Sequence, residues 1–325
     1  MNNDFGQSLR MTIFGASHDS GVGILIEGVP AGVHLPAELF TTDLDRRRPK
    51  LHGETTRHES DTPHIEGLEG NRTTGAPVRI TFYNSNTRSA DYSHLVEHPR
   101  PSHADLVQRQ KYGEEYNLAG GGIASGRMTV ALVAAGVVAK QLIPGVAFTT
   151  ELISIGGNDN PTTFETIIAE AARMGDSVGG VIECRATGIP RSLGEPFFDS
   201  AESIIAHLLF SIPAVKGVEF GDGFVGCTKR GSERNDRIID AEGHTATNNE
   251  GGINGGITNG NDIVLRVAIK PTPSIVRAQD TYNFKDGAIS ALTIGGRHDA
   301  CIARRAAVVV EAMVAYALAE LKLRR

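Results

Sequence analysis

Residues 303–322, ARRAAVVVEAMVAYALAELK, and residues 128–142, MTVALVAAGVVAKQL, show the clearest helical periodicity in the sequence. In both, Ala, Val and Met surround only a few polar residues. A helix that is apolar on most sides is buried in a protein core or spans a membrane. Their near-apolar parts, 306–319 and 128–139, are interrupted or shorter than the ~18–20 residues that a bilayer requires. The sequence therefore predicts two long helices inside the fold.

Other segments predict the elements that surround these helices. Strands are expected at 22–30, 76–83, 179–188 and 261–271, and further helices at 36–47, 162–174 and 199–211. Some strands alternate polar and apolar residues, which suits a sheet with one face in water. Because strands and helices do not alternate in strict βαβ order, the predicted fold class is α+β. No linker divides the chain, so residues 1–325 are predicted to form one domain.

The composition is that of a globular protein with an excess of glycine. The chain has 38 glycines among 325 residues, against a usual level of ~7%, so many tight turns and close backbone approaches are expected. The net charge of −6 argues against nucleic acid or a membrane as a partner. Three cysteines without metal-like spacing, and an N-terminus without the apolar core of a signal peptide, predict a reduced, cytoplasmic protein with no metal site.

Two glycine-rich segments each lead into one of the apolar helices and carry an arginine. They are GGGIASGR at 120–127, with Arg127, and GGRHDAC at 295–301, with Arg297. A helix N-terminus exposes unpaired N–H groups and the positive end of the helix dipole, and a guanidinium adds two donors in a fixed fork. These features predict anion binding. The basic segment 46–58, RRRPKLHGETTRH, is either a solvated face or a further contact with a polyanionic ligand.

Candidate proton-transfer groups occur in long segments or turns. Segments expected to be loops of more than ~12–15 residues are usually functional or disordered, and the content of His, Arg, Asn and Gly favours function for 50–72, 84–102 and 228–260. His18 lies in a Gly/Ser turn, and His103 follows Arg100 and a proline. In such surroundings an imidazole could give or take a proton. The Asn/Gly-rich segment 248–260 suggests backbone laid against a flat ligand.

Ten motifs occur in the order that they take in one enzyme family. They are FGASHDSGVGILIEGVP, DLDRRRP, RPSHAD followed by KYG, GGGIASGR, GDSVGG, LGEPFFD, AVKGVEFGDGF, GGINGGITNG, IKPTPSI and GRHDACIARRA followed by VVEAM. From about residue 5 to residue 322 the sequence therefore resembles the chorismate synthase family. The resemblance implies a single α+β domain, a β-α-β sandwich with long buried helices between two antiparallel sheets, assembled as a homotetramer.

The resemblance also implies a reaction. Members of this family convert 5-enolpyruvylshikimate 3-phosphate to chorismate by losing phosphate and the C6 proton in a 1,4 sense. They require reduced FMN although nothing is oxidised overall. A lyase of the shikimate pathway, which leads to the aromatic amino acids, is thus implied, with NADPH or a separate flavin reductase as the source of reducing power. One phosphate and two carboxylates on the substrate would explain a basic segment in an acidic protein.

Matching the motifs residue by residue implies a set of roles. His18 would protonate the departing phosphate, His103 would balance the charge of the reduced flavin, and Asp299 would assist proton removal at the flavin N5. The residues implied to hold substrate anions are Ser17, Arg47, Arg100 and Arg127. The residues implied to contact FMN are Ser125, Gly255, Lys270, Thr272, Ser274 and Arg297.

The sequence departs from the family pattern around the flavin. Ile123, Ala124 and Pro213 stand where the family usually has residues that make polar contacts with FMN, so weak binding of free FMN is predicted. A segment between 156 and 175 is also shorter than usual. The implied proton-transfer residues are all retained.

Two alternatives to a chorismate synthase remain open from the sequence. One is a divergent paralogue that acts on another phosphorylated acid and binds flavin differently or not at all. The other is a non-catalytic protein that kept the anion pocket as a metabolite sensor or an inactive partner subunit. Retention of His18, His103 and Asp299 together favours an enzyme, because a binding protein has no need of all three.

Overall fold

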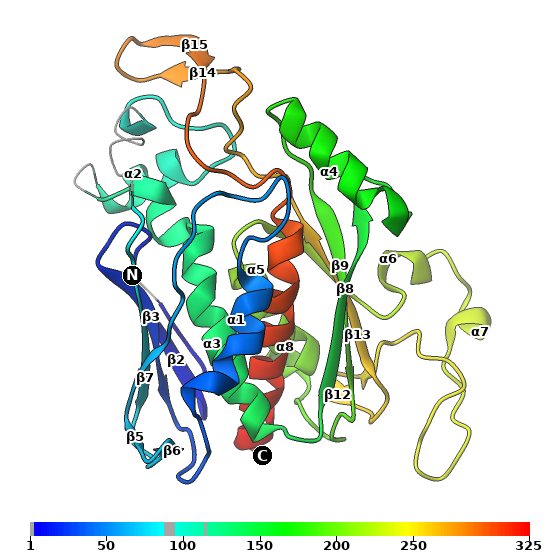
Figure 1. The fold of residues 1–325 in the computed structure, drawn as a ribbon. Coiled ribbons are helices and arrows are strands. Elements are labelled where there is room, and N and C mark those ends of the chain that lie inside the picture. The colour runs from blue at the N-terminus through cyan, green and yellow to red at the C-terminus, as the bar shows by residue number, and fades with distance from the viewer. Residues whose placement is uncertain (1–2, 88–94, 114–115) are drawn as a thin grey trace.

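The computed structural model describes residues 3–87, 95–113 and 116–325, and a layer of helices lies between two antiparallel sheets (Figure 1). The first sheet has the strand order β1 (Asp4–Phe5), β2 (Arg10–Gly15), β3 (Gly21–Glu27), β7 (Val78–Tyr83) and β4 (His64–Glu66). The second has the order β10 (Val215–Phe220), β13 (Ile263–Ile269), β9 (Gly180–Thr187) and β8 (Ala147–Ile155). The predicted α+β sandwich is confirmed.

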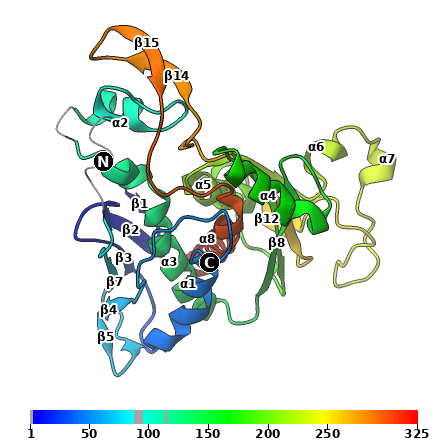
Figure 2. The ribbon, with the colours of Figure 1, turned by 45° about the horizontal axis from the view of Figure 1, so that its top comes forward.

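Three two-stranded ribbons, eight α-helices and several short 3-10 helices complete the described elements. The ribbons are β5–β6 (Leu68–Glu69, Arg72–Thr73), β11–β12 (Ile253–Asn254, Ile257–Thr258) and β14–β15 (Gln279–Asn283, Ala288–Leu292). The helices are α1 (Thr41–Arg47), α2 (Asp105–Tyr112), α3 (Thr129–Leu142), α4 (Phe164–Arg173), α5 (Ala201–Ser211), α6 (Gly223–Gly226), α7 (Gly231–Arg234) and α8 (Ala303–Arg324). Figure 2 shows the β14–β15 hairpin and the α6–α7 region projecting from the sandwich on different sides.

Helices α3 and α8 form the centre of the sandwich. Helix α3 packs on β3 of the first sheet, and α8 packs on β8 and β9 of the second. A Cβ atom on Gly136 in α3 would overlap Ala312 in α8, so a glycine is needed for the two backbones to come this close. One cluster of buried apolar side chains includes residues of both sheets and of these helices.

Two glutamates lie inside the apolar surface of α8, and each has polar partners. Glu311 accepts hydrogen bonds from Arg46 at 2.7 Å and from Lys140 at 2.6 Å. Glu320 accepts from the backbone N–H groups of Gln7 and Ser8. Buried charges are tolerated where they are paired and hydrogen-bonded, so these contacts allow an otherwise apolar helix to carry two acids in the core.

The predicted elements agree with the structure, with ends that differ by up to three residues, except that 36–47 is split into a 3-10 turn at Ala37–Phe40 and α1. The elements that were not predicted include strands β1, β4, β8 and β10 and the β14–β15 hairpin. Part of the predicted loop 84–102, residues 88–94, lies outside the described residues. Among the helices that the structure describes, none is long and apolar enough to cross a membrane.

Candidate active site

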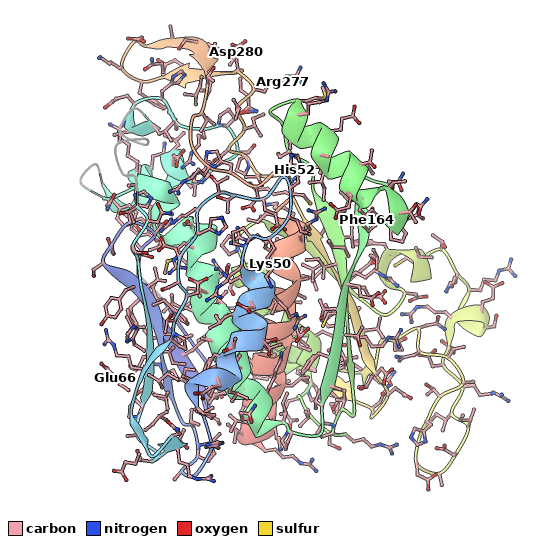
Figure 3. All side chains as sticks on the ribbon, viewed as in Figure 1. Lys50, His52, Glu66, Phe164, Arg277 and Asp280 are labelled. Atoms are coloured by element: carbon pink, nitrogen blue, oxygen red, sulfur yellow. The ribbon has the colours of Figure 1, made fainter. Side chains whose placement is uncertain are left out.

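A cavity of about 620 Å³ lies at the N-terminal ends of α3 and α8. Its lining comes from six segments, which are 45–61, 100–104, 120–129, 212–214, 270–274 and 297–309. Figure 3 shows Lys50, which lines the cavity, and nearby His52, whose carbonyl accepts a hydrogen bond from Arg304 in the first turn of α8. Both glycine-rich segments therefore open onto one cavity, and its volume is typical of a small-molecule site.

The cavity is strongly cationic in a chain that is acidic overall. Its lining contains seven arginines and two lysines but only four carboxylates, Asp45, Glu59, Asp61 and Asp299. The chain as a whole has a formal charge of −6. A concave site with a local excess of five cations attracts anions and raises their local concentration.

His103 lies beside a buried acid that also holds an arginine. Its Nδ1 is 2.7 Å from Oδ1 of Asp105, and Asp105 accepts hydrogen bonds from Nε and Nη2 of Arg100 at 2.7 and 2.6 Å. Burial lowers the pKa of His103, with Asp105 opposing and Arg100 adding to the decrease. Burial alone would raise the pKa of Asp105, but bonds from Arg100 and His103 hold it well below its usual range. Arg100 also donates to Ser274 at 2.9 Å.

His18 and Ser17 lie against the glycine-rich segment. Gly120 lines the cavity and has φ of +63°, and a Cβ atom there would come within 2.5 Å of the His18 ring and 2.9 Å of Ser17 Oγ. Ser17 is fully buried, and its hydroxyl accepts a hydrogen bond from Arg57 at 2.9 Å. The missing side chain at Gly120 is therefore what allows His18 to lie next to the cavity wall.

Arg47 and Arg127 share one buried carboxylate. Arg47 donates to Oδ2 of Asp61 at 3.1 Å, and Arg127 donates to Oδ1. Burial lowers the pKa of Arg47 to about 9, with Asp61 opposing, so the guanidinium stays charged at neutral pH. Within the part of the chain that the structure describes, the buried Nη2 of Arg127 has no hydrogen-bond partner. It is a donor available to a ligand anion.

Asp299 and Arg297 are held by the segment that precedes Arg57. Asp299 accepts from the backbone N–H of Thr55 at 3.1 Å and forms an ion pair with Arg305 at 3.0 Å. The Thr55 hydroxyl donates to the carbonyl of Arg297 at 2.9 Å. The guanidinium of Arg297 donates to Asn86. The ion pair with Arg305 and the hydrogen bond from Thr55 thus fix the position of the Asp299 carboxyl group at the cavity wall.

Five of the six residues implied to contact FMN line the same cavity: Ser125, Lys270, Thr272, Ser274 and Arg297. The Oγ1 atom of Thr272 is buried and has no partner among the described residues, so it is a second polar atom available to a ligand. Lys270 donates to the carbonyl of Ser102 at 2.7 Å.

Gly255 and the rest of 228–260 are absent from the cavity lining. Ala201 donates to the carbonyl of Gly256, and the nearby Asp199 pairs with Arg324 at the C-terminal end of α8, far from the cavity. A Cβ at Gly252 would come within 2.5 Å of the Asp262 carbonyl oxygen. Gly252 thus permits close approach of backbone to backbone, whereas a Cβ at Gly255 would meet nothing within 4 Å, and the flat-ligand role of 248–260 stays a prediction.

The residues at which the chain departs from the family pattern fall into two cavities. Ala124 lines the main cavity, and Ile123 lines a smaller one of about 260 Å³ together with Met11 and Met128. Pro213 lines both. Ala124 and Pro213 are therefore the substitutions that change the wall of the main cavity.

Sequence reasoning missed several polar residues of the site. Arg57, Asp61, His298 and Arg305 all line the cavity, and burial lowers the pKa of His298. The sequence signals for the first two were the basic segment 46–58, which contains Arg57, and the predicted loop 50–72, which contains both. Arg57 contacts Ser17 and Asp61 contacts Arg127, 40 and 66 positions away, so spacing alone gives no indication of these contacts.

Comparison with known proteins gives the same family throughout. A family model described as chorismate synthase matches residues 9–323. The chorismate synthase of Chitinophaga pinensis is 51% identical over 99% of this chain and 96% of its own length. That of Trichormus variabilis is 41% identical over 100% and 98%. That of Korarchaeum cryptofilum is 40% identical over 97% and 96%.

The fold is similar to that of a solved relative as well. A crystal structure of chorismate synthase matches with a TM-score of 0.76 and 28% identity, over 98% of this chain and 93% of the other. Similarity over nearly the whole length does not favour a paralogue with another substrate or a non-catalytic sensor. The chain therefore belongs to the chorismate synthase family of carbon–oxygen lyases.

Proposed function

We propose that the main cavity is where this enzyme converts 5-enolpyruvylshikimate 3-phosphate to chorismate and phosphate, and that reduced FMN binds in the same cavity. The observation that carries the proposal is the excess of five cations in the lining, close to His18, His103 and Asp299. A substrate with a phosphate and two carboxylates matches that charge, and the three titratable groups match a reaction that moves protons.

Arg47, Arg100 and Arg127 are assigned to the substrate anions, with Ser17 alongside. All three guanidiniums are at most 6% exposed, so their contacts with an anion would be weakly screened by water. Arg127 has the clearest direct role, because its Nη2 is buried without a partner in the described structure. The donors of Arg47 go to Thr129, Asp61 and two backbone carbonyls, so Arg47 contributes chiefly through its charge.

The residues present fit FMN. Thr272 offers its unpartnered hydroxyl, Lys270 and Arg297 offer cations for a phosphate, and Ser125 and Ser274 offer hydroxyls in the same wall. Reduced flavin, when bound, supplies an electron-rich ring that helps phosphate to leave an allylic carbon. Gly255 does not line the cavity and is not among the residues proposed to hold FMN.

His18 is assigned to give a proton to the departing phosphate oxygen. His103 is assigned to stand beside the cofactor, and its Nδ1 lies 2.7 Å from Oδ1 of Asp105. An anion close to the imidazole would oppose the effect of burial and raise the pKa of His103 again. The His103 proton then balances ligand charge only while the ligand is bound. Asp299, which forms an ion pair with Arg305, is assigned to accept a proton.

Three further expectations are part of the proposal. We propose a homotetramer in the cytoplasm, supplied with reduced flavin by NADPH or a separate reductase. Exposed apolar side chains support an oligomer, since the adjacent Phe197 and Phe198 are 86% and 93% exposed and exposed apolar surface marks interaction sites. Sedimentation of the purified protein tests the tetramer.

Anaerobic assay with reduced FMN and the substrate, followed by chorismate absorbance, tests the activity itself. Calorimetry at low and high salt tests the cationic cavity, because substrate affinity should fall as salt screens the contacts. Absence of chorismate formation would overturn the activity, and absence of substrate binding at low salt would overturn the site.

A further inference from the structure

Residues 55–61, TTRHESD, form a segment outside the helices and strands whose side chains alternate in exposure. Four of them are buried or half-buried, Thr55, Arg57, Glu59 and Asp61, and the three between them are exposed, Thr56, His58 and Ser60. This alternation is typical of backbone in which successive side chains point to opposite sides. One side of this segment therefore faces the protein along its whole length, although the segment is not paired in a sheet.

The inward side makes contact with assigned residues along its length. Thr55 holds Asp299 and the carbonyl of Arg297. Arg57 donates to the hydroxyl and the carbonyl of Ser17 at 2.9 and 3.0 Å.

Glu59 secures the middle of the segment. It accepts hydrogen bonds from Arg57 at 2.8 Å and from the backbone N–H of Ser85 at 2.9 Å. Burial alone would raise the pKa of Glu59, but the hydrogen bonds from Ser85 and Arg57 lower it. The charge of Arg57 is thereby balanced inside the segment, and Arg57 is fixed against Ser17.

Asp61 ends the segment between two assigned arginines. It is 4% exposed, and each of its oxygens accepts from a different guanidinium, Oδ2 from Arg47 and Oδ1 from Arg127. Its φ of +48° is in the left-handed region, which aspartate and asparagine tolerate better than most residues. Two like charges would otherwise repel each other in a site of low dielectric.

We propose that residues 55–61 are a positioning segment for the active site, and that Asp61 is the positioning residue that fixes Arg47 and Arg127 relative to one another. This inference rests on the proposed function, because it takes both arginines as substrate contacts. Asp61 acts through them, since both of its oxygens are engaged by guanidiniums. It sets the geometry of the anion site and does not supply attraction for the substrate.

Asp61→Asn separates geometry from charge. Asparagine keeps the size and tolerates the backbone conformation, but its amide NH₂ would face one of the two guanidiniums, donor against donor. The substrate needs several anion contacts at fixed spacing, so its dissociation constant is expected to rise about tenfold or more. Inorganic phosphate needs one contact, and the variant cavity has one negative charge fewer, so phosphate is expected to bind at least as tightly.

The test is calorimetry of wild type and Asp61→Asn with 5-enolpyruvylshikimate 3-phosphate and, separately, with inorganic phosphate. Ser60→Ala is the matched control, because the Ser60 side chain is exposed and only its carbonyl has a contact, and its two affinities should equal those of wild type. Unchanged substrate affinity in Asp61→Asn, or equal weakening of both ligands, would overturn the positioning role. If wild type itself binds no substrate, the proposed function is what fails.

A second variant covers the case in which Asp61→Asn does not fold. Asp61→Glu keeps the charge and moves the carboxylate by one methylene. If the position of the carboxylate fixes the two arginines, substrate affinity falls in Asp61→Glu while phosphate affinity stays near that of wild type. If Asp61→Glu binds both ligands as wild type does, the charge alone suffices and the inference is wrong.

Discussion

Oδ1 of Asp105 lies 2.7 Å from Nδ1 of His103 and also accepts a hydrogen bond from Arg100 at 2.6 Å. One carboxylate thus orients a proposed proton-transfer group and a proposed substrate contact. Since Asp105 opposes the effect of burial on His103, we expect Asp105→Asn to lower the pKa of His103 further and to reduce kcat. Titration of the His103 ring by NMR checks the first effect, and an unchanged titration curve would contradict it.

The same carboxylate gives a pH-dependent contribution to stability. The pKa of Asp105 is lower in the folded protein than in the unfolded chain, where an aspartate has a pKa of about 4. The contribution of Asp105 to the free energy of unfolding is therefore complete above that pH and is lost as the pH falls toward the folded-state pKa. Removing one partner of a buried pair typically costs about 3–5 kcal/mol. We therefore expect Asp105→Asn to unfold at lower urea than wild type at pH 7, with a smaller difference at pH 3.5.

The control for Asp105→Asn is the same substitution in an exposed aspartate–histidine pair. Asp240 lies 2.7 Å from Nδ1 of His244 in a surface loop. Because water screens this pair, Asp240→Asn should leave the unfolding midpoint and kcat nearly unchanged. If Asp240→Asn changed the unfolding midpoint and kcat as much as Asp105→Asn, burial of the pair would not explain the contribution of Asp105.

His18→Ala and His103→Ala are expected to lower kcat by about 10²–10⁴-fold, the usual range for a general acid or base. Substrate affinity should change far less, because the anion contacts come from arginines. Stopped-flow assay of chorismate formation and calorimetry of substrate binding give the two quantities. His244→Ala, in the exposed loop, should match wild type in both. A parallel loss of affinity and rate would mean that the histidines only bind substrate.

Free FMN is expected to bind weakly, so the protein should purify colourless. Ala124 lines the main cavity, and Ala124→Ser would restore a hydroxyl worth about 0.5–1.5 kcal/mol, which is roughly a twofold to tenfold gain in FMN affinity. Ile123→Arg should give no such gain, because Ile123 lines the smaller cavity. Quenching of flavin fluorescence measures both. Tight FMN binding by the free wild type would refute the prediction.

Gly136→Ala tests the close packing of α3 on α8. Alanine is the better helix former by about 1 kcal/mol, but its Cβ would overlap Ala312, and overpacking a core costs about 1–3 kcal/mol. The expected result is a lower melting temperature. Gly145→Ala is the control, because a Cβ there meets nothing within 4 Å, and it should be neutral or slightly stabilising. A more stable Gly136→Ala variant would show that the helices can move apart.

The apolar patterns predicted the layers of the fold, but not all of its strands. The apolar composition of the segments that form α3 and α8 was enough to predict that these helices are buried. Strand β8, AFTTELISI, is exposed or half-buried along most of its length, so it lacks the apolar signal that marked β9 and β13. Its place is fixed by pairing with β9, which is a property of the folded chain.

The cavity lining was predictable where a motif carried the residue, as for His103 and Arg127. The roles of Asp61 and Thr55 could not be predicted, because these residues act through contacts with Arg127 and Asp299, which are 66 and 244 positions away in the sequence. A polar segment without periodicity gives no sign of which side will face the protein. Gly255 illustrates the converse, since its motif is present but a single chain does not bring it to the cavity.

Helix α8 follows every described strand of both sheets in the sequence, although it packs at their centre. During synthesis, both sheets lack this central partner until residues 303–324 leave the ribosome. At about 5–20 residues per second, the interval between β3 and α8 is roughly 15–60 s. The apolar inner faces of the strands must be kept from aggregating for that time, so we expect the nascent chain to need a chaperone and its folding to finish only after α8 has emerged.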